Sequence, residues 1–79
     1  MKAGLYDRVR LLVDVTSEYR DQVLARGTEG TVVETFERPR EGYAVDFSIP
    51  DDRLVGGYRH ENVMLAPDQI EVVARHAPR

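Results

Sequence analysis

A chain of 79 residues is long enough for one domain with a small core. It contains no cysteine, which excludes disulfides and thiolate metal sites, and no apolar run near the ~18 residues of a membrane-spanning helix. The formal net charge of −3 lacks the basic excess that is typical of nucleic-acid-binding proteins.

Strict alternation predicts a first, half-buried strand within the segment YDRVRLLVDV. The apolar residues at every second position would face the core: Val9, Leu11 and Val13. Charged residues between them would face solvent: Arg8, Arg10 and Asp14. Leu12 interrupts the pattern, so we expect the outer face of this strand to be partly covered.

The next segment, TSEYRDQVLARG, predicts a long loop that contains one or two helical turns. Thr16 or Ser17 can cap a helix by accepting a backbone N–H. Tyr19 and Val23 have the i, i+4 spacing of one helix face. Gly27 suits the left-handed residue that follows a last turn.

Gly30 lies three residues after Gly27 and directly before TVVETF, which is rich in β-branched residues. Such a glycine permits either a positive φ or a close approach to a neighbouring strand. We therefore predict a tight turn that leads into a strand. A phosphate-binding loop would need more glycines, a strand before it, and a helix or a Lys-Ser/Thr pair after it.

Two further strands and their connections follow. ERPREG is a polar connection with Pro39 and Gly42. YAVDF alternates again, with inward positions Tyr43, Val45 and Phe47 and outward positions Ala44 and Asp46. SIPDDRLVGGYRHE predicts a long loop with Pro50, Gly56 and Gly57, and NVMLA predicts a short fourth strand.

The C-terminal part predicts a 3-10 turn at PDQ and a last strand at IEVVA, with Ile70 and Val72 on one face. Five short strands, one long first loop and a tight turn before the last strand are typical of a small, partly open β-barrel. We expect an all-β fold in a single domain over residues 1–79, with its core at about residues 5–73.

The chain resembles SH3-like barrels at several short motifs: Asp7-x-Val9-x-Leu11, Gly27-x-x-Gly30-Thr31-Val32-Val33-Glu34, Tyr43-x-Val45-x-Phe47, Val63-x-Leu65 and Ile70-x-Val72. It is similar to a bacterial family of small single-domain barrels of unknown function, which carries the Gly-x-x-Gly-Thr-Val-Val-Glu element and a closing Asp-Gln-Ile/Leu-Glu-Val. Members of that family resemble immunity or antitoxin-type proteins, so the resemblance implies a protein partner.

The barrel domain of the nitrile hydratase β subunit is a looser likeness. It is similar at these motifs: Asp7-Arg8-Val9-Arg10, Arg26-Gly27-x-x-Gly30, Tyr43-x-Val45-x-Phe47 and Leu54-Val55-Gly56. The first loop here lacks the His and Pro of that family, and Val55 stands where it has Trp. Cysteines of the other subunit hold the metal in those enzymes, so hydratase activity is not implied.

The sequence predicts no catalytic, metal or cofactor site. His60 and His76 are the only histidines, and two without a nearby third ligand do not predict a zinc site. Ser17 and Ser48 have no neighbouring histidine in sequence to activate them. We therefore expect a protein without enzymatic activity.

Acidic residues gather in the middle of the chain, at Glu34, Glu37, Glu41, Asp46, Asp51 and Asp52. The pair Asp51-Asp52 after Pro50 favours a turn in which an Asp side chain bonds its own backbone. The cluster as a whole is either a solvated face or a patch that docks a basic partner.

We predict a cytoplasmic protein-binding module without a signal peptide, because charged residues interrupt the N-terminal apolar stretch. The residues expected to dock a partner, at one end of the barrel, are Glu18, Tyr19, Arg20, Glu37, Arg38, Tyr58 and Arg59. Nucleic-acid binding is the main alternative, and it would use Tyr19, Arg20, Arg26, Tyr58 and Arg59. An accessory subunit of a larger enzyme and a homodimer through an exposed strand edge also stay open.

Overall fold

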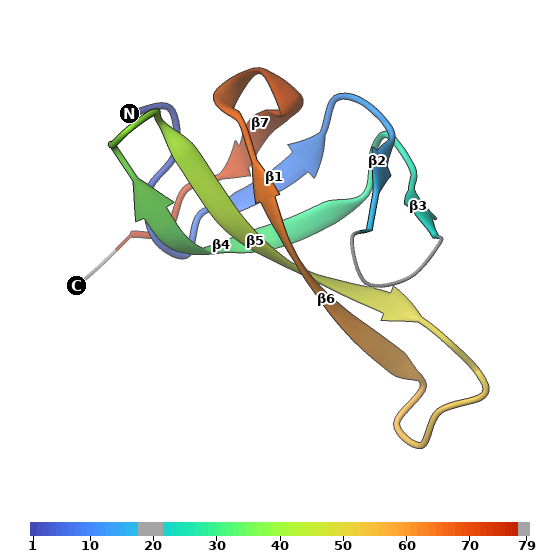
Figure 1. Ribbon diagram of the computed structural model, residues 1–79. Helices are drawn as coiled ribbons and strands as arrows, with labels where there is room; N and C mark the ends of the chain where they lie inside the picture. Colours follow the sequence, from blue (N-terminus) through green and yellow to red (C-terminus); the bar gives the residue numbers. More distant parts are fainter. Residues whose placement is uncertain (18–21, 78–79) are drawn as a thin grey trace.

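The protein is built from short antiparallel strands, as a computed structural model shows for residues 1–17 and 22–77 (Figure 1). In chain order the elements are β1 Arg8–Leu11, β2 Val15–Thr16, β3 Val23–Leu24, β4 Glu29–Phe36, β5 Gly42–Pro50, β6 Tyr58–Leu65, the 3-10 helix η1 Pro67–Gln69 and β7 Ile70–Ala74. One five-stranded sheet has the order β6-β5-β4-β1-β7, and β2 pairs with β3 in a separate ribbon. The predicted all-β class, the five-stranded sheet and the 3-10 turn are confirmed.

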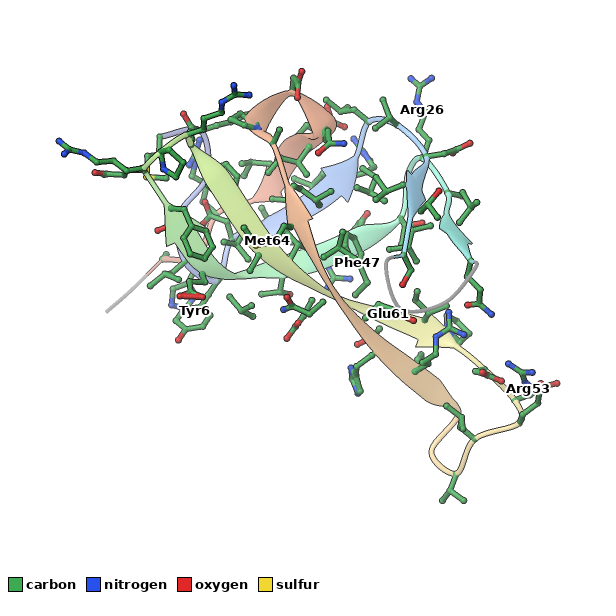
Figure 2. All side chains as sticks on the ribbon, in the orientation of Figure 1. Tyr6, Arg26, Phe47, Arg53, Glu61 and Met64 are labelled. Carbon is green, nitrogen blue, oxygen red and sulfur yellow. The ribbon has the colours of Figure 1, made fainter. Side chains whose placement is uncertain are left out.

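The sheet curls around the core but stays open, because β6 and β7 are its two outer strands in the described part of the chain. The fully buried side chains come from strands β1, β4, β5 and β7: Val9, Leu11, Val32, Tyr43, Val45, Phe47 and Ile70. Phe47 lies inside the curved sheet in Figure 2. Alternation therefore identified the core-facing positions of β1, β5 and β7 correctly.

Two single positions differ from the alternation. Val13 was expected inside, but it is exposed, because β1 ends at Leu11 and the chain bends away. Ala44 was expected outside, but it is buried between its cross-strand neighbours Glu34 and Met64. A small side chain between two larger ones loses its access to water.

Gly30 permits a close approach of strands rather than a positive φ. A Cβ at this position would lie 2.6 Å from the carbonyl oxygen of Asp46 and 2.8 Å from Cδ1 of Phe47. Only a hydrogen fits there, so the paired strands β4 and β5 can approach each other closely at this position. Gly27 does have the predicted left-handed backbone, with φ of +93°.

The predicted helical turn before Gly27 is absent from the described residues of that segment. Val15 pairs with Leu24 and Thr16 pairs with Val23, so both sides of the loop are strands. Ser17 does not cap a helix; its backbone N–H donates to the carbonyl of Gln22 at 2.9 Å. β-branched residues on both sides favour the ladder over the helix. Tyr19, the other half of the expected helix pair, lies outside the described residues.

The predicted long loop at 48–61 is mostly a hairpin. β5 continues to Pro50 and β6 starts at Tyr58, and these two residues are cross-strand partners. Only residues 51–57 connect the strands. The hairpin extends away from the rest of the sheet, with its loop at the far end (Figure 1). Pairing over the whole length of β5 outweighs the turn-like composition of the segment.

Candidate functional site

The predicted partner-binding residues do not meet at one end of the molecule. Glu37 and Arg38 follow Phe36, which pairs with Gly42 at the start of β5. Tyr58 pairs with Pro50 at the end of β5. Eight steps of about 3.3 Å place these two groups roughly 26 Å apart along the strand. Three of the other predicted residues lie outside the described part of the chain: Glu18, Tyr19 and Arg20.

Arg59 is buried, contrary to its expected place in an exposed loop. β6 alternates between exposed and buried positions, and Arg59 and Glu61 both occupy buried ones. The Nε atom of Arg59 lies 3.1 Å from Oε1 of Glu61, and its Nη1 atom lies 3.6 Å from Oδ2 of Asp51. Buried charges are tolerated when they pair in this way. The side chain of Arg59 is therefore directed toward the two carboxylates of the hairpin, and only 8% of the residue is exposed.

The same charged cluster reaches the first loop. The hydroxyl of Ser17 donates to Oε2 of Glu61 at 3.1 Å, which ties the chain after β2 to the middle of β6. Figure 2 shows Glu61 between the β5–β6 hairpin and the small ribbon. The cluster thus holds the base of the hairpin against the neighbouring loop.

Asp51 fixes the hairpin loop. Its carboxylate accepts the backbone N–H of Arg53 at 3.1 Å and two guanidinium bonds from Arg53, both at 3.0 Å. The Arg53 side chain, its backbone N–H and the guanidinium of Arg59 lower the pKa of Asp51 to about 2. The predicted turn role of Asp51 is confirmed. Backbone bonds from Asp51 N to Gly57 O and from Gly57 N to Leu54 O close the loop.

The loop presents an apolar surface, which we call the hairpin tip and define as Leu54, Val55 and Tyr58. Leu54 is 44% exposed, Tyr58 is 57% exposed, and Val55 is fully exposed. Gly56 and Gly57 both have positive φ, which turns the chain back beneath Val55. Tyr58 was predicted as a partner-binding residue from the sequence, whereas Leu54 and Val55 were not. Their signal was two adjacent apolar residues inside a polar, glycine-containing loop.

A shallow hollow of about 370 Å³ lies beside the hairpin tip, with Ser48, Val55, Tyr58 and His60 in its lining. The hydroxyl of Ser48 and Nδ1 of His60 are 3.3 Å apart. Cross-strand pairing thus joins a serine and a histidine that are distant in sequence. Both side chains are exposed, and the hollow is a polar border to the apolar tip.

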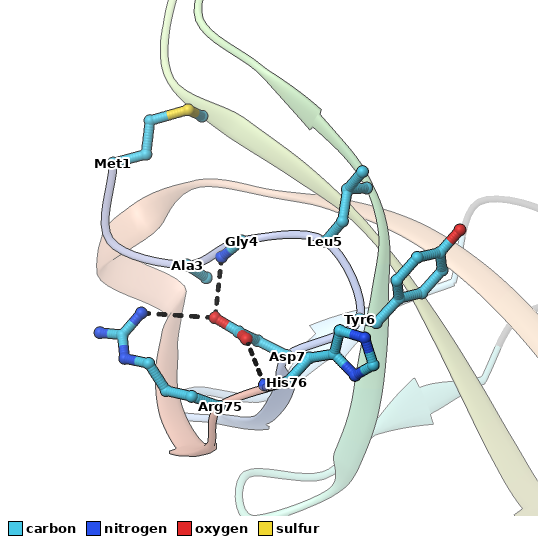
Figure 3. A pocket seen from close by; sticks show the side chains of 8 residues that line it. All are labelled: Met1, Ala3, Gly4, Leu5, Tyr6, Asp7, Arg75 and His76. Carbon is cyan, nitrogen blue, oxygen red and sulfur yellow. Dashed lines mark hydrogen bonds and ion pairs between the residues drawn. The ribbon is translucent and has the colours of Figure 1, made fainter. Parts of the chain in front are cut away.

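A second hollow, of about 570 Å³, lies where the first and last described residues meet (Figure 3). The buried carboxylate of Asp7 accepts the backbone N–H groups of Gly4, at 2.8 Å, and His76, at 2.7 Å, and pairs with Arg75 at 3.4 Å. Burial alone would raise the pKa of Asp7, but these donors together hold it below its ordinary value. Asp7 therefore links the N-terminal segment before β1 to the segment that follows β7.

The acidic residues in the middle of the chain do not form one free patch. Asp51 is buried in its ion pairs, and Glu41 accepts the backbone N–H of Lys2 and the hydroxyl of Tyr43. Asp46 accepts a bond from Asn62. In residues 1–17 and 22–77, no three side chains of His, Asp or Glu are placed to hold a metal ion.

The family described as "Domain of unknown function (DUF4926)" matches residues 5–72, which is most of the chain. The chain belongs to this family. The resemblance to a family of small domains of unknown function is thereby confirmed.

No curated protein matches this DUF4926 domain, and no solved structure matches it. The likeness to SH3-like barrels and to the nitrile hydratase β subunit is therefore not confirmed. Within the described residues of the DUF4926 domain, no helix has the length and apolar character needed to cross a membrane.

Proposed function

We propose that this protein is a protein-binding module without enzymatic activity, and that it docks its partner through the hairpin tip. The observation that carries the proposal is the exposure of Leu54, Val55 and Tyr58 together at the end of an extended hairpin. Single exposed apolar residues are common, but several on one projecting loop are typical of interaction sites. Complete burial of a Leu or Val side chain against a partner contributes about 1.5–3 kcal/mol of favourable free energy to binding.

The anchoring of the loop supports the same function. Binding costs less free energy when the contacting residues are already held in place. Here the carboxylate of Asp51 fixes Arg53 at the start of the loop, and the ion pair with Arg59 connects the loop to the hairpin base. Figure 2 shows Arg53 at the loop end of the hairpin. The apolar side chains are thus presented by an ordered loop.

A protein partner is favoured over nucleic acid. Of the described residues predicted for nucleic-acid binding, Arg59 is buried among carboxylates, whereas Arg26 and Tyr58 are exposed. The hairpin tip is apolar, and the chain carries a net charge of −3. A phosphate backbone requires several accessible cations along its path.

An immunity or antitoxin-type protein and an accessory subunit of an enzyme are both forms of this proposal. The class of the partner distinguishes them, since the first binds a toxin and the second binds a catalytic chain. A cytoplasmic location belongs to the proposal as well, and the lack of cysteine is compatible with a reducing compartment.

Site-specific photo-crosslinking in an extract of the native host tests the proposal. A photoreactive side chain replaces Val55 in one protein and Val73, an exposed valine of β7, in a matched control. We expect one partner protein to crosslink at position 55 and not at position 73. Equal crosslinking at both positions, or none at position 55, would contradict docking through the hairpin tip.

A further inference from the structure

We infer that the protein has a second interaction surface, which binds an acidic, extended segment of a partner protein. This turn-end groove lies at the β4–β5 connection, at the opposite end of β5 from the hairpin tip. It is a hollow of about 360 Å³ with mostly apolar walls. Its lining includes the charged residues Arg38, Arg40 and Glu41 and the apolar residues Phe36, Pro39 and Met64.

The two arginines supply charge without an internal counter-ion. Arg38 and Arg40 are exposed, and within the described part of the chain neither guanidinium makes a hydrogen bond or an ion pair. Most other described arginines are ion-paired within the molecule: Arg8, Arg10, Arg53, Arg59 and Arg75. A guanidinium matches the geometry of a carboxylate with two parallel bonds. Arg38 and Arg40 are therefore suited to carboxylates from outside.

The nearby carboxylate of Glu41 does not occupy these guanidiniums. It accepts the backbone N–H of Lys2 at 3.0 Å and the hydroxyl of Tyr43. The carboxylate of Glu41 is thus bound to Lys2 and Tyr43, and it does not pair with Arg38 or Arg40. The positive charge at the groove stays uncompensated by a direct contact.

The apolar wall and the neighbouring strand define the rest of the ligand. Met64 is more than half exposed although it lies on β6, next to the groove. β6 is an outer strand of the sheet, and such an edge accepts an extended peptide more readily than a helix. The groove therefore fits an extended segment that carries carboxylates for the arginines and an apolar side chain for the wall.

The same arginines could in principle meet phosphates, but the surroundings favour a protein segment. Nucleic-acid sites combine a run of cations with stacked bases, whereas this groove has two guanidiniums and aliphatic walls around Phe36. An oligonucleotide is therefore included as a competing ligand in the test.

Fluorescence anisotropy with a short labelled peptide of alternating Glu and Leu tests this inference. The full chain should bind the peptide, and Arg40→Glu should weaken binding at least about tenfold. Arg26→Glu is the matched control, because Arg26 is exposed and its guanidinium has no partner among the described residues. It should leave the affinity unchanged, as should Val55→Ser at the hairpin tip.

Two further peptides and one oligonucleotide define the chemistry of the ligand. Replacing each Glu by Lys should abolish binding, and replacing each Leu by Ser should weaken it. The inference is overturned if the Glu–Leu peptide does not bind at about 1 mM, a concentration that detects even weak association. It is also overturned if Arg26→Glu and Arg40→Glu have equal effects, or if oligothymidylate binds more tightly than the peptide.

Discussion

The Oδ2 atom of Asp51 lies 3.6 Å from the Nη1 atom of Arg59, and this contact joins the exposed hairpin loop to the buried charges at its base. Arg59 continues the chain of contacts to Glu61, which accepts a bond from Ser17. This ionic network thus connects the loop that carries Leu54 and Val55 to the base of the hairpin. Stability of the hairpin and presentation of the hairpin tip depend on the same residues.

The first prediction concerns Arg59. Arg59→Ala would remove the cation that lies between Asp51 and Glu61, while Asp51 keeps its bonds to Arg53, so the free energy of unfolding should fall by at most about 3–5 kcal/mol. Replacing both Arg59 and Glu61 with Met is the control, because removal of both charges should cost less than removal of one. Urea denaturation measures both variants. An Arg59→Ala protein as stable as the wild type would contradict the buried network.

A second prediction tests the strand contact at Gly30. Gly30→Ala would place a methyl group 2.6 Å from the carbonyl oxygen of Asp46, so the strands must shift. We expect the free energy of unfolding to fall by about 1–3 kcal/mol. Gly42→Ala is a suitable control, because its Cβ would lie 3.6 Å from the carbonyl oxygen of Leu65, which is an ordinary contact distance. Equal thermal stability of the two variants would be inconsistent with the close approach.

The third prediction is a pH dependence from Asp51. Its pKa is about 2 in the folded protein against an ordinary value of 3.8, so the folded state favours the ionised form. The contribution to stability is therefore complete above the ordinary value and is lost as pH falls from about 4 toward 2. Asp51→Asn should be less stable than the wild type at neutral pH, and the difference should shrink in acid. A stability difference that does not change with pH would argue against this account.

Alternation along the strands predicted most of the core, because a side chain on a half-buried strand faces the core at every second residue. Val9, Leu11, Tyr43, Val45 and Phe47 all lie inside as expected. At Gly30 the sequence left two options open, a positive φ and a close approach of strands, and the structure has the close approach.

Most of the misses share one physical cause, which is strand pairing that the pattern within a single segment does not reveal. Thr16 was a candidate helix cap and Val23 was one half of an i, i+4 pair, yet the ladder between β2 and β3 sets their conformation. Tyr58 and Arg59 seemed to belong to a loop, but pairing with β5 makes them a strand and turns Arg59 inward. Only the folded arrangement brings Asp51, Arg59 and Glu61 together.

The candidate site was predicted in part for the same reason. Tyr58 and Arg38 were selected as exposed aromatic and charged residues, and both are exposed. Their separation along β5 could not be predicted, because it depends on how far the hairpin extends beyond Phe47. We therefore propose two surfaces at opposite ends of β5 in place of the single surface that the sequence predicted.

Isothermal titration calorimetry with the purified partner tests docking through the hairpin tip most directly. The variant Leu54→Ser with Val55→Ser removes the apolar side chains of an exposed loop without touching the core, and Val73→Ser is its control. We predict that the tip variant binds at least about tenfold more weakly than the wild type, with the control unchanged. Equal affinity of the wild type and the tip variant would contradict the account.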